Sequence, residues 1–142
     1  MKKVLLGLVL LLGFNGISQK KTDRISGIRC GKLFCVNEME IDLSNSDTTY
    51  IVYCQFQNIK YQVLTDMGSI FISSKSTLDK TINNLKECLK YMDDKSLSFR
   101  VGEFNISKSS KDLFVYDGDK FTFLNKKNVI KFINYLEKCV MK

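Results

Sequence analysis

Two segments of this chain resemble each other, and that similarity constrains the fold more than any other feature of the sequence. After a shift of 51 residues, Lys60–Leu89 aligns with Lys111–Val140 without a gap. A unit of this size cannot bury its apolar face alone, so two copies fold by packing against each other. We therefore predict an internal repeat over about residues 50–92 and 97–142. Identical pairs suited to a core include Ile82 and Ile133, Leu85 and Leu136, and Cys88 and Cys139.

Both units predict the same order of elements, three strands followed by a helix. In the first unit, Tyr50–Phe56 alternates between apolar and polar residues, as a half-buried strand does. Ser76 is expected to cap the helix that follows. In the second unit, Asp117-Gly118-Asp119 is typical of a hairpin turn. Apolar residues at helical spacing end each unit, Leu78, Ile82, Leu85 and Leu89 in the first and Val129, Ile133, Leu136 and Val140 in the second.

This order of elements predicts one α+β domain over residues 19–142. The duplicated strand-strand-strand-helix unit should form a mostly antiparallel sheet of about six strands with two helices on one face. Gly27–Val36 and Met39–Leu43 precede the repeat and are expected to add edge strands. The polar loop over residues 44–49 separates them from the repeat.

The first 18 residues have the layout of a secretory signal peptide. Lys2 and Lys3 precede the apolar run Val4–Leu12, and small residues stand at Gly16 and Ser18. This pattern predicts cleavage before Gln19 and export to the periplasm or the extracellular space. The apolar run is too short to span a bilayer, which takes about 20 residues. We therefore expect no membrane span after cleavage.

Composition restricts the chemistry and the partners of this protein. The chain has no His, which excludes Ser-His-Asp and Cys-His catalysis and zinc sites that need imidazole. We expect no catalytic residue, no metal and no cofactor. The net charge of +7 favours an acidic protein face, an anionic glycan or phosphate headgroups as partner. Nucleic acid is not expected, because only Arg24 and Arg29 lie near the start and no RNA-binding motif is present.

The five cysteines allow disulfides in an exported protein. Cys30 and Cys35 enclose a four-residue segment, so a tight hairpin would bring them together, and they are the predicted disulfide. Cys54, Cys88 and Cys139 fall on apolar positions and are expected to pack in the core.

A group of lysines populates the outer side of the last helix, namely Lys126, Lys127, Lys131 and Lys138. These residues form a predicted basic face for an anionic partner. The alternative is a solvated helix surface with no specific target.

Three functions remain open at the level of sequence. The first is an exported binding module without catalysis, which engages an envelope or extracellular protein or an anionic ligand. The second is a small carboxylate-dependent hydrolase or lyase, and two carboxylates about 5–9 Å apart in a cleft would favour it. The third is a structural subunit that dimerises through a sheet edge. A flat apolar patch on the sheet face away from the helices would favour binding. The acidic candidates for the enzyme are Glu103, Asp112, Asp117 and Asp119.

Overall fold

The computed structural model describes residues 19–59, 66–101 and 106–142, and these form an α+β fold with two antiparallel sheets and two helices. The predicted signal peptide lies outside the described residues, and so does Tyr61–Thr65, which the sequence predicts as the second of the three strands in the first unit. The first sheet has the order β1-β2-β3-β4 and the second the order β5-β6-β7-β8. The elements are β1 (Lys20–Cys30), β2 (Leu33–Asp42), β3 (Thr48–Gln57), β4 (Met67–Ile72), α2 (Lys75–Lys90), β5 (Phe99–Val101), β6 (Ile106–Ser109), β7 (Asp112–Asp117), β8 (Lys120–Leu124) and α3 (Lys126–Leu136).

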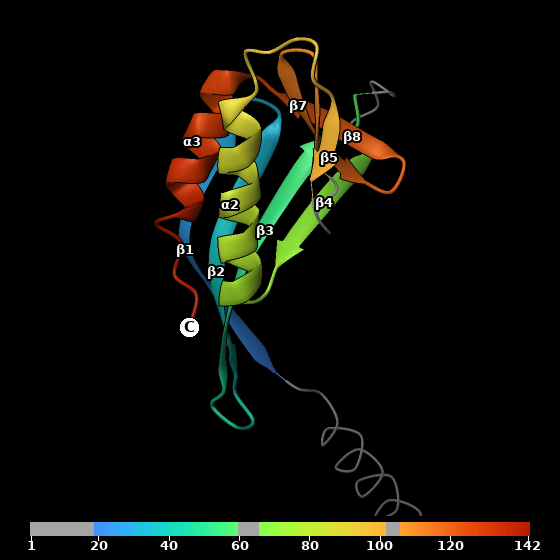
Figure 1. The fold of residues 1–142 in the computed structure, drawn as a ribbon. Coiled ribbons are helices and arrows are strands. Elements are labelled where there is room, and N and C mark those ends of the chain that lie inside the picture. The colour runs from blue at the N-terminus through green and yellow to red at the C-terminus, as the bar shows by residue number, and fades with distance from the viewer. Residues whose placement is uncertain (1–18, 60–65, 102–105) are drawn as a thin grey trace, which may run out of the picture.

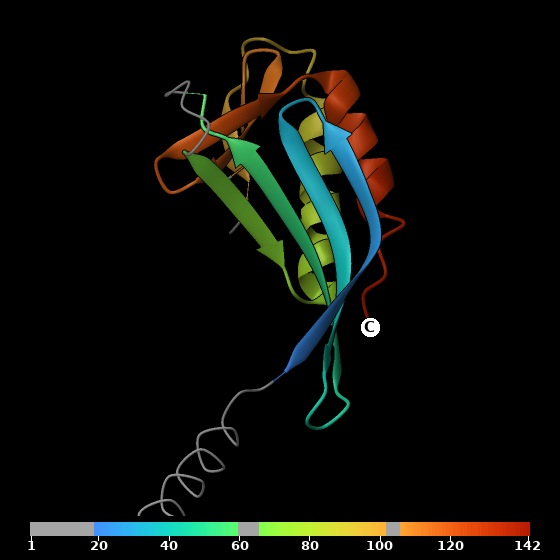
Figure 2. The same cartoon turned by 180° about the vertical axis from the view of Figure 1, so that it is seen from behind.

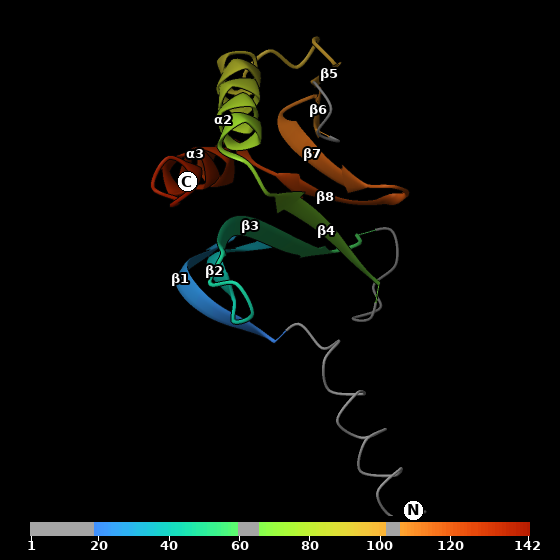
Figure 3. The same ribbon diagram turned by 90° about the horizontal axis from the view of Figure 1, so that it is seen from below.

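The two helices lie side by side and are shared between the sheets (Figure 1). Helix α3 contacts β1 of the first sheet and β7 and β8 of the second, and α2 packs on α3. The view from below shows both helices on the same side of the first sheet, next to the second sheet (Figure 3). One cluster of buried apolar side chains joins all these elements. Because the strands form two separate sheets, the prediction of one sheet of about six strands is wrong.

The hairpin of β1 and β2 makes half of the first sheet. Gly31 begins its two-residue turn with φ of 62°, in the left-handed region that glycine adopts at no steric cost. A Cβ on Gly31 would also lie 2.8 Å from the Asn128 side chain of α3. The polar loop over residues 44–49 is the tip of the next hairpin, between β2 and β3. It does not separate edge strands from a repeat, because β2 pairs directly with β3 along its whole length.

Polar side chains cap the start of both helices. The Ser74 side chain accepts from the Thr77 N–H at α2, and Asn125 accepts from the Asn128 N–H at α3. The predicted cap at Ser76 is thus two residues late. Three of the four residues in each predicted apolar stripe are buried, whereas Leu89 and Val140 are half-buried and Val140 lies beyond the end of α3 at Leu136.

The predicted repeat agrees with the helices and disagrees with the strands. Both helix starts and both caps are related by the shift of 51 residues, as are the buried Leu85 and Leu136. In the strands before them, however, buried Ile72 aligns with Phe123, which is 41% exposed. A slip of one residue reverses the faces of a strand. The number of residues from the last core residue of the strand to the helix cap therefore differs between the two units.

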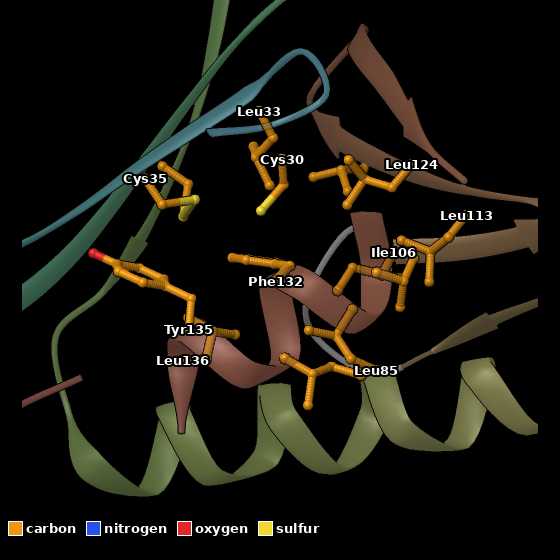
Figure 4. Packing of buried hydrophobic residues seen from close by; sticks show 14 of the residues in the cluster. Cys30, Leu33, Cys35, Leu85, Ile106, Leu113, Leu124, Phe132, Tyr135 and Leu136 are labelled. Atoms are coloured by element: carbon orange, nitrogen blue, oxygen red, sulfur yellow. A yellow bond between two sulfur atoms is a disulfide. The ribbon is translucent and has the colours of Figure 1, made fainter. Parts of the chain in front are cut away.

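The disulfide joins two adjacent strands of the first sheet. Cys35 on β2 and Cys54 on β3 lie directly opposite each other, and their Cα atoms are 4.0 Å apart. Cys30 is a free, buried thiol, so the predicted Cys30–Cys35 bond is wrong. The two-residue turn pairs Cys30 with Leu33, which leaves Cys35 two positions away from Cys30 along the hairpin. Figure 4 shows Cys30 and Cys35 in the core beside Phe132 of α3.

Candidate functional site

The face of the first sheet that points away from the helices carries the candidate site, and we call it the outer face. Cys35, Cys54 and Ile72 point towards the core from β2, β3 and β4. Because successive side chains of a strand point to opposite faces, the residues next to them along the strands point outward. Seen from behind, neither α2 nor α3 covers this face of the sheet (Figure 2). The outward side chains of the described strands are therefore not covered by a described helix.

Aromatic side chains gather on the outer face, towards the edge strand β4. Tyr53 and Phe71 lie opposite each other on β3 and β4, with ring centroids 4.6 Å apart and planes tilted by 32°. Phe71 is 62% exposed, the largest value among the exposed apolar residues of the described chain. Val36 lies opposite Tyr53 and is almost fully covered, while Phe34 of the same strand is exposed. We call Phe34, Val36, Tyr53 and Phe71 the aromatic patch.

A shallow hollow lies at one end of the aromatic patch, beside the turn between β1 and β2. Its volume is about 360 Å³, and we call it the sheet hollow. Arg29, Phe34 and Gln55 are register partners on three adjacent strands, so they form one row across its wall. The described lining residues include two cations and no acid, and they are Arg29, Gly31, Lys32, Phe34, Gln55, Gln57 and Met67.

The polar side chains that line the sheet hollow have no partner among the described residues. Neither Arg29 nor Lys32 forms a side-chain hydrogen bond or ion pair with another residue that the structure describes, and the same holds for Gln55 and Gln57. Elsewhere lysines are paired with carboxylates, as Lys75 is with Asp79. The sheet hollow therefore combines positive charge with free hydrogen-bonding capacity.

Arg24 borders the aromatic patch from the other side. Its guanidinium lies 5.8 Å from the centre of the Phe34 ring, within the range of a cation–π contact. Its Nε atom is 4.0 Å from a Glu38 oxygen. Surface pairs of this kind contribute little to stability, so Arg24 is available to an acidic group that replaces Glu38.

Side chains from other elements block parts of both edges of the first sheet. On β4, the Ser69 N–H donates to the Asp117 carboxylate, and Lys120 donates to the Met67 carbonyl. On β1, Tyr135 and Lys131 of α3 donate to the carbonyls of Ser26 and Arg29. Blocked backbone groups prevent pairing with another strand. The arrangement thus disfavours these edge positions as an interface and leaves the outer face.

The predicted basic face on α3 is partly used within the molecule. Lys126 forms an ion pair with Asp93, and Lys131 donates to the Arg29 carbonyl at 2.8 Å. Lys127 and Lys138 are exposed, and Lys138 lies beyond the end of the helix. Lys126 also lines a hollow of about 640 Å³ with Asp93. The residues that line this hollow include acids as well as cations, so it has less net positive charge than the sheet hollow.

Among the acidic candidates that the structure describes, Asp117 and Asp119 lie at one hairpin turn and Asp112 lies at the other end of β7. Glu103 lies outside the described residues. Asp112 and Asp117 begin and end β7, so their backbones are separated by roughly 16 Å at the usual rise of a strand. Asp117 accepts from the Ser69 N–H, and Asp119 stands in the adjacent turn. Within the described residues, no three His, Cys, Asp or Glu side chains are grouped so that they could hold a metal ion.

The free cysteines have environments that disfavour the thiolate. Burial raises the pKa of the Cys88 and Cys139 thiols to about 11. Burial also raises the pKa of Cys30, against the opposing charge of Lys131. A nucleophilic cysteine needs the opposite shift.

The sequence pattern alone does not single out the sheet hollow. Its residues come from four strands and a turn, and only the strand register aligns Arg29 with Phe34 and Gln55. One signal is present in the sequence. Cys54, Phe56 and Val52 alternate with Tyr53, Gln55 and Gln57, which implies that the second set faces outward.

No protein-family model, curated protein or solved structure matches this chain. Neither described helix is long and apolar enough to cross a membrane. The function has to be inferred from the geometry of the outer face itself.

Proposed function

We propose that this protein is an exported binding module that engages an anionic partner through the outer face of its first sheet. The observation that carries the proposal is the exposed Phe71 ring of β4, which packs on Tyr53 of β3 on a sheet face that neither described helix covers. Large aromatic side chains contribute much of the binding free energy at protein surfaces, because each buries a large area and loses little conformational entropy.

The charge around the aromatic patch favours an anionic partner. Arg24, Arg29 and Lys32 border the patch, and Arg29 and Lys32 have no acidic partner among the described residues. A basic rim attracts an acidic partner and orients it before contact, and aromatic rings then supply buried area.

Export agrees with the cysteine chemistry. A disulfide such as Cys35–Cys54 supports an oxidising compartment, and the predicted signal peptide would direct the protein to one. The corresponding caps and apolar stripes of α2 and α3 support the proposed repeat, and we assign them a scaffold role for the outer face.

Binding of purified protein to the cell-envelope fraction of the producing cell tests this proposal. We expect Phe71→Ser to reduce binding at least tenfold, because it removes the exposed ring. Phe123→Ser is the matched control, since Phe123 is 41% exposed on the second sheet. Equal binding by both variants, or equal loss in both, would contradict the proposal.

A further inference from the structure

We propose that the partner is an acidic polysaccharide and that the sheet hollow binds one of its uronate residues. This inference depends on the proposed function, because it names the chemical class of the ligand for the same face. The sheet hollow and the aromatic patch together present cations, amides and rings, and the inference follows from their combination.

The cations fit the carboxylate of a uronate. The guanidinium of Arg29 is planar and can donate two parallel hydrogen bonds to a carboxylate, and Lys32 adds a second positive charge from the turn. Neither side chain has to break an internal ion pair, because neither has one in the described structure. A carboxylate bound there also meets no described acidic lining residue.

The amides fit the hydroxyl groups of a sugar. Each hydroxyl both donates and accepts a hydrogen bond, and a glutamine amide does the same with its two ends. Gln55 and Gln57 project from one strand two residues apart, so both point to the outer face and line the sheet hollow. A fully ionised phosphate group only accepts hydrogen bonds, so it would leave the side-chain carbonyl oxygens of Gln55 and Gln57 without a donor.

The rings fit the apolar faces of sugars. Phe34 forms part of the wall of the sheet hollow, where the C–H groups of a sugar ring can pack on the electron-rich face of the aromatic ring. Tyr53 and Phe71 continue across β3 and β4. The path from Phe34 to Phe71 crosses two strand spacings of about 4.8 Å and shifts by two residues along the strands, so it spans roughly 12 Å. The outer face therefore holds more than one unit of an extended chain.

A titration of the purified protein followed by amide NMR shifts tests this inference. The probes are oligogalacturonate, hyaluronan fragments, neutral oligogalactose of matched length, and hexaglutamate. We expect a uronate probe to shift the signals of Arg29, Gln55 and Gln57, and to bind at least tenfold more tightly than either oligogalactose or hexaglutamate. Arg29→Gln should lower the uronate affinity at least tenfold, and Phe34→Leu should lower it as well. Lys80→Gln, on the exposed side of α2, should leave it unchanged.

Two outcomes would overturn the inference. The first is that neither uronate probe binds at millimolar concentration. The second is that hexaglutamate binds as tightly as the better uronate, which would identify an acidic protein segment as the ligand. In both cases, loss of envelope binding by Phe71→Ser would still support the proposed function, so failure of the glycan inference and failure of the binding module are separable. All variants are exposed on the surface, and their amide spectra report whether they fold.

Discussion

Asn37 holds Val140 with both ends of its side-chain amide. Its Nδ2 atom donates to the Val140 carbonyl at 3.1 Å, and its Oδ1 atom accepts from the Val140 N–H at 2.8 Å. Asn37 is fully buried on β2, and Nδ2 also donates to the Ile51 carbonyl on β3 at 3.0 Å. One side chain thus anchors the C-terminal segment to the first sheet, as a paired strand would.

Removal of this anchor should destabilise the protein. Asn37→Ala leaves buried backbone groups of Val140 and Ile51 without partners, so we expect a loss of roughly 2–4 kcal/mol in the free energy of unfolding. Urea denaturation measures the loss, and hydrogen exchange of the Val140 amide should accelerate. Asn83→Ala on the exposed side of α2 is the control and should change stability by less than about 0.5 kcal/mol. An Asn37→Ala variant as stable as that control would contradict the anchoring role.

The buried stripes of the two helices lead to a second stability prediction. Leu85 and Leu136 are both fully buried, so truncation to Ala should reduce the free energy of unfolding by about 2–5 kcal/mol in each case. Ile130→Ala, at a position 41% exposed on α3, should have little effect. Chemical denaturation compares the three variants. Losses at Leu85 and Leu136 no larger than at Ile130 would show that the helices do not pack as described.

The fold could be predicted from sequence where short-range patterns determine it, and it could not where long-range pairing does. The alternation over Tyr50–Phe56 and the helical spacing of Leu78, Ile82 and Leu85 predict β3 and α2 correctly. The division into two sheets depends on which strands pair, and no local pattern specifies that. Cys35 shows the same limit, since its partner is set by the β2–β3 register and not by its nearness to Cys30. The sheet hollow is missed for this reason too.

The cysteines lead to a prediction about covalent structure. Peptide mapping of the oxidised protein should identify a bond between Cys35 and Cys54 and three free thiols. Iodoacetamide at neutral pH should label Cys30, Cys88 and Cys139 only after denaturant is added, because burial raises the pKa of each thiol. A bond between Cys30 and Cys35 would contradict the described β1–β2 register. Rapid labelling of the folded protein would identify a reactive cysteine and favour the enzyme alternative.

Stability should decline in alkaline solution. Burial raises the pKa of Tyr135 to about 12, and burial raises the pKa of Cys88 and Cys139 to about 11. The unfolded chain loses these protons at lower pH than the folded protein does, so deprotonation favours unfolding. The stabilisation is complete below about pH 9, the thiol value in an unfolded chain, and is lost as the pH rises towards 12. Urea midpoints across this range measure the decline, and Tyr135→Phe should flatten its upper part.

Photo-crosslinking at Phe71 tests the central claim, that the outer face meets a partner, most directly. Phe71 is replaced by p-benzoylphenylalanine in the producing cell, and Phe123, the exposed ring of the second sheet, is replaced in a parallel strain. Irradiation should produce a covalent adduct at position 71 and little at position 123. The position 71 adduct should weaken when Arg29→Gln is added, because the basic rim holds the anionic partner. Equal adducts at both positions, or none at position 71, would contradict the assignment of the outer face as the binding surface.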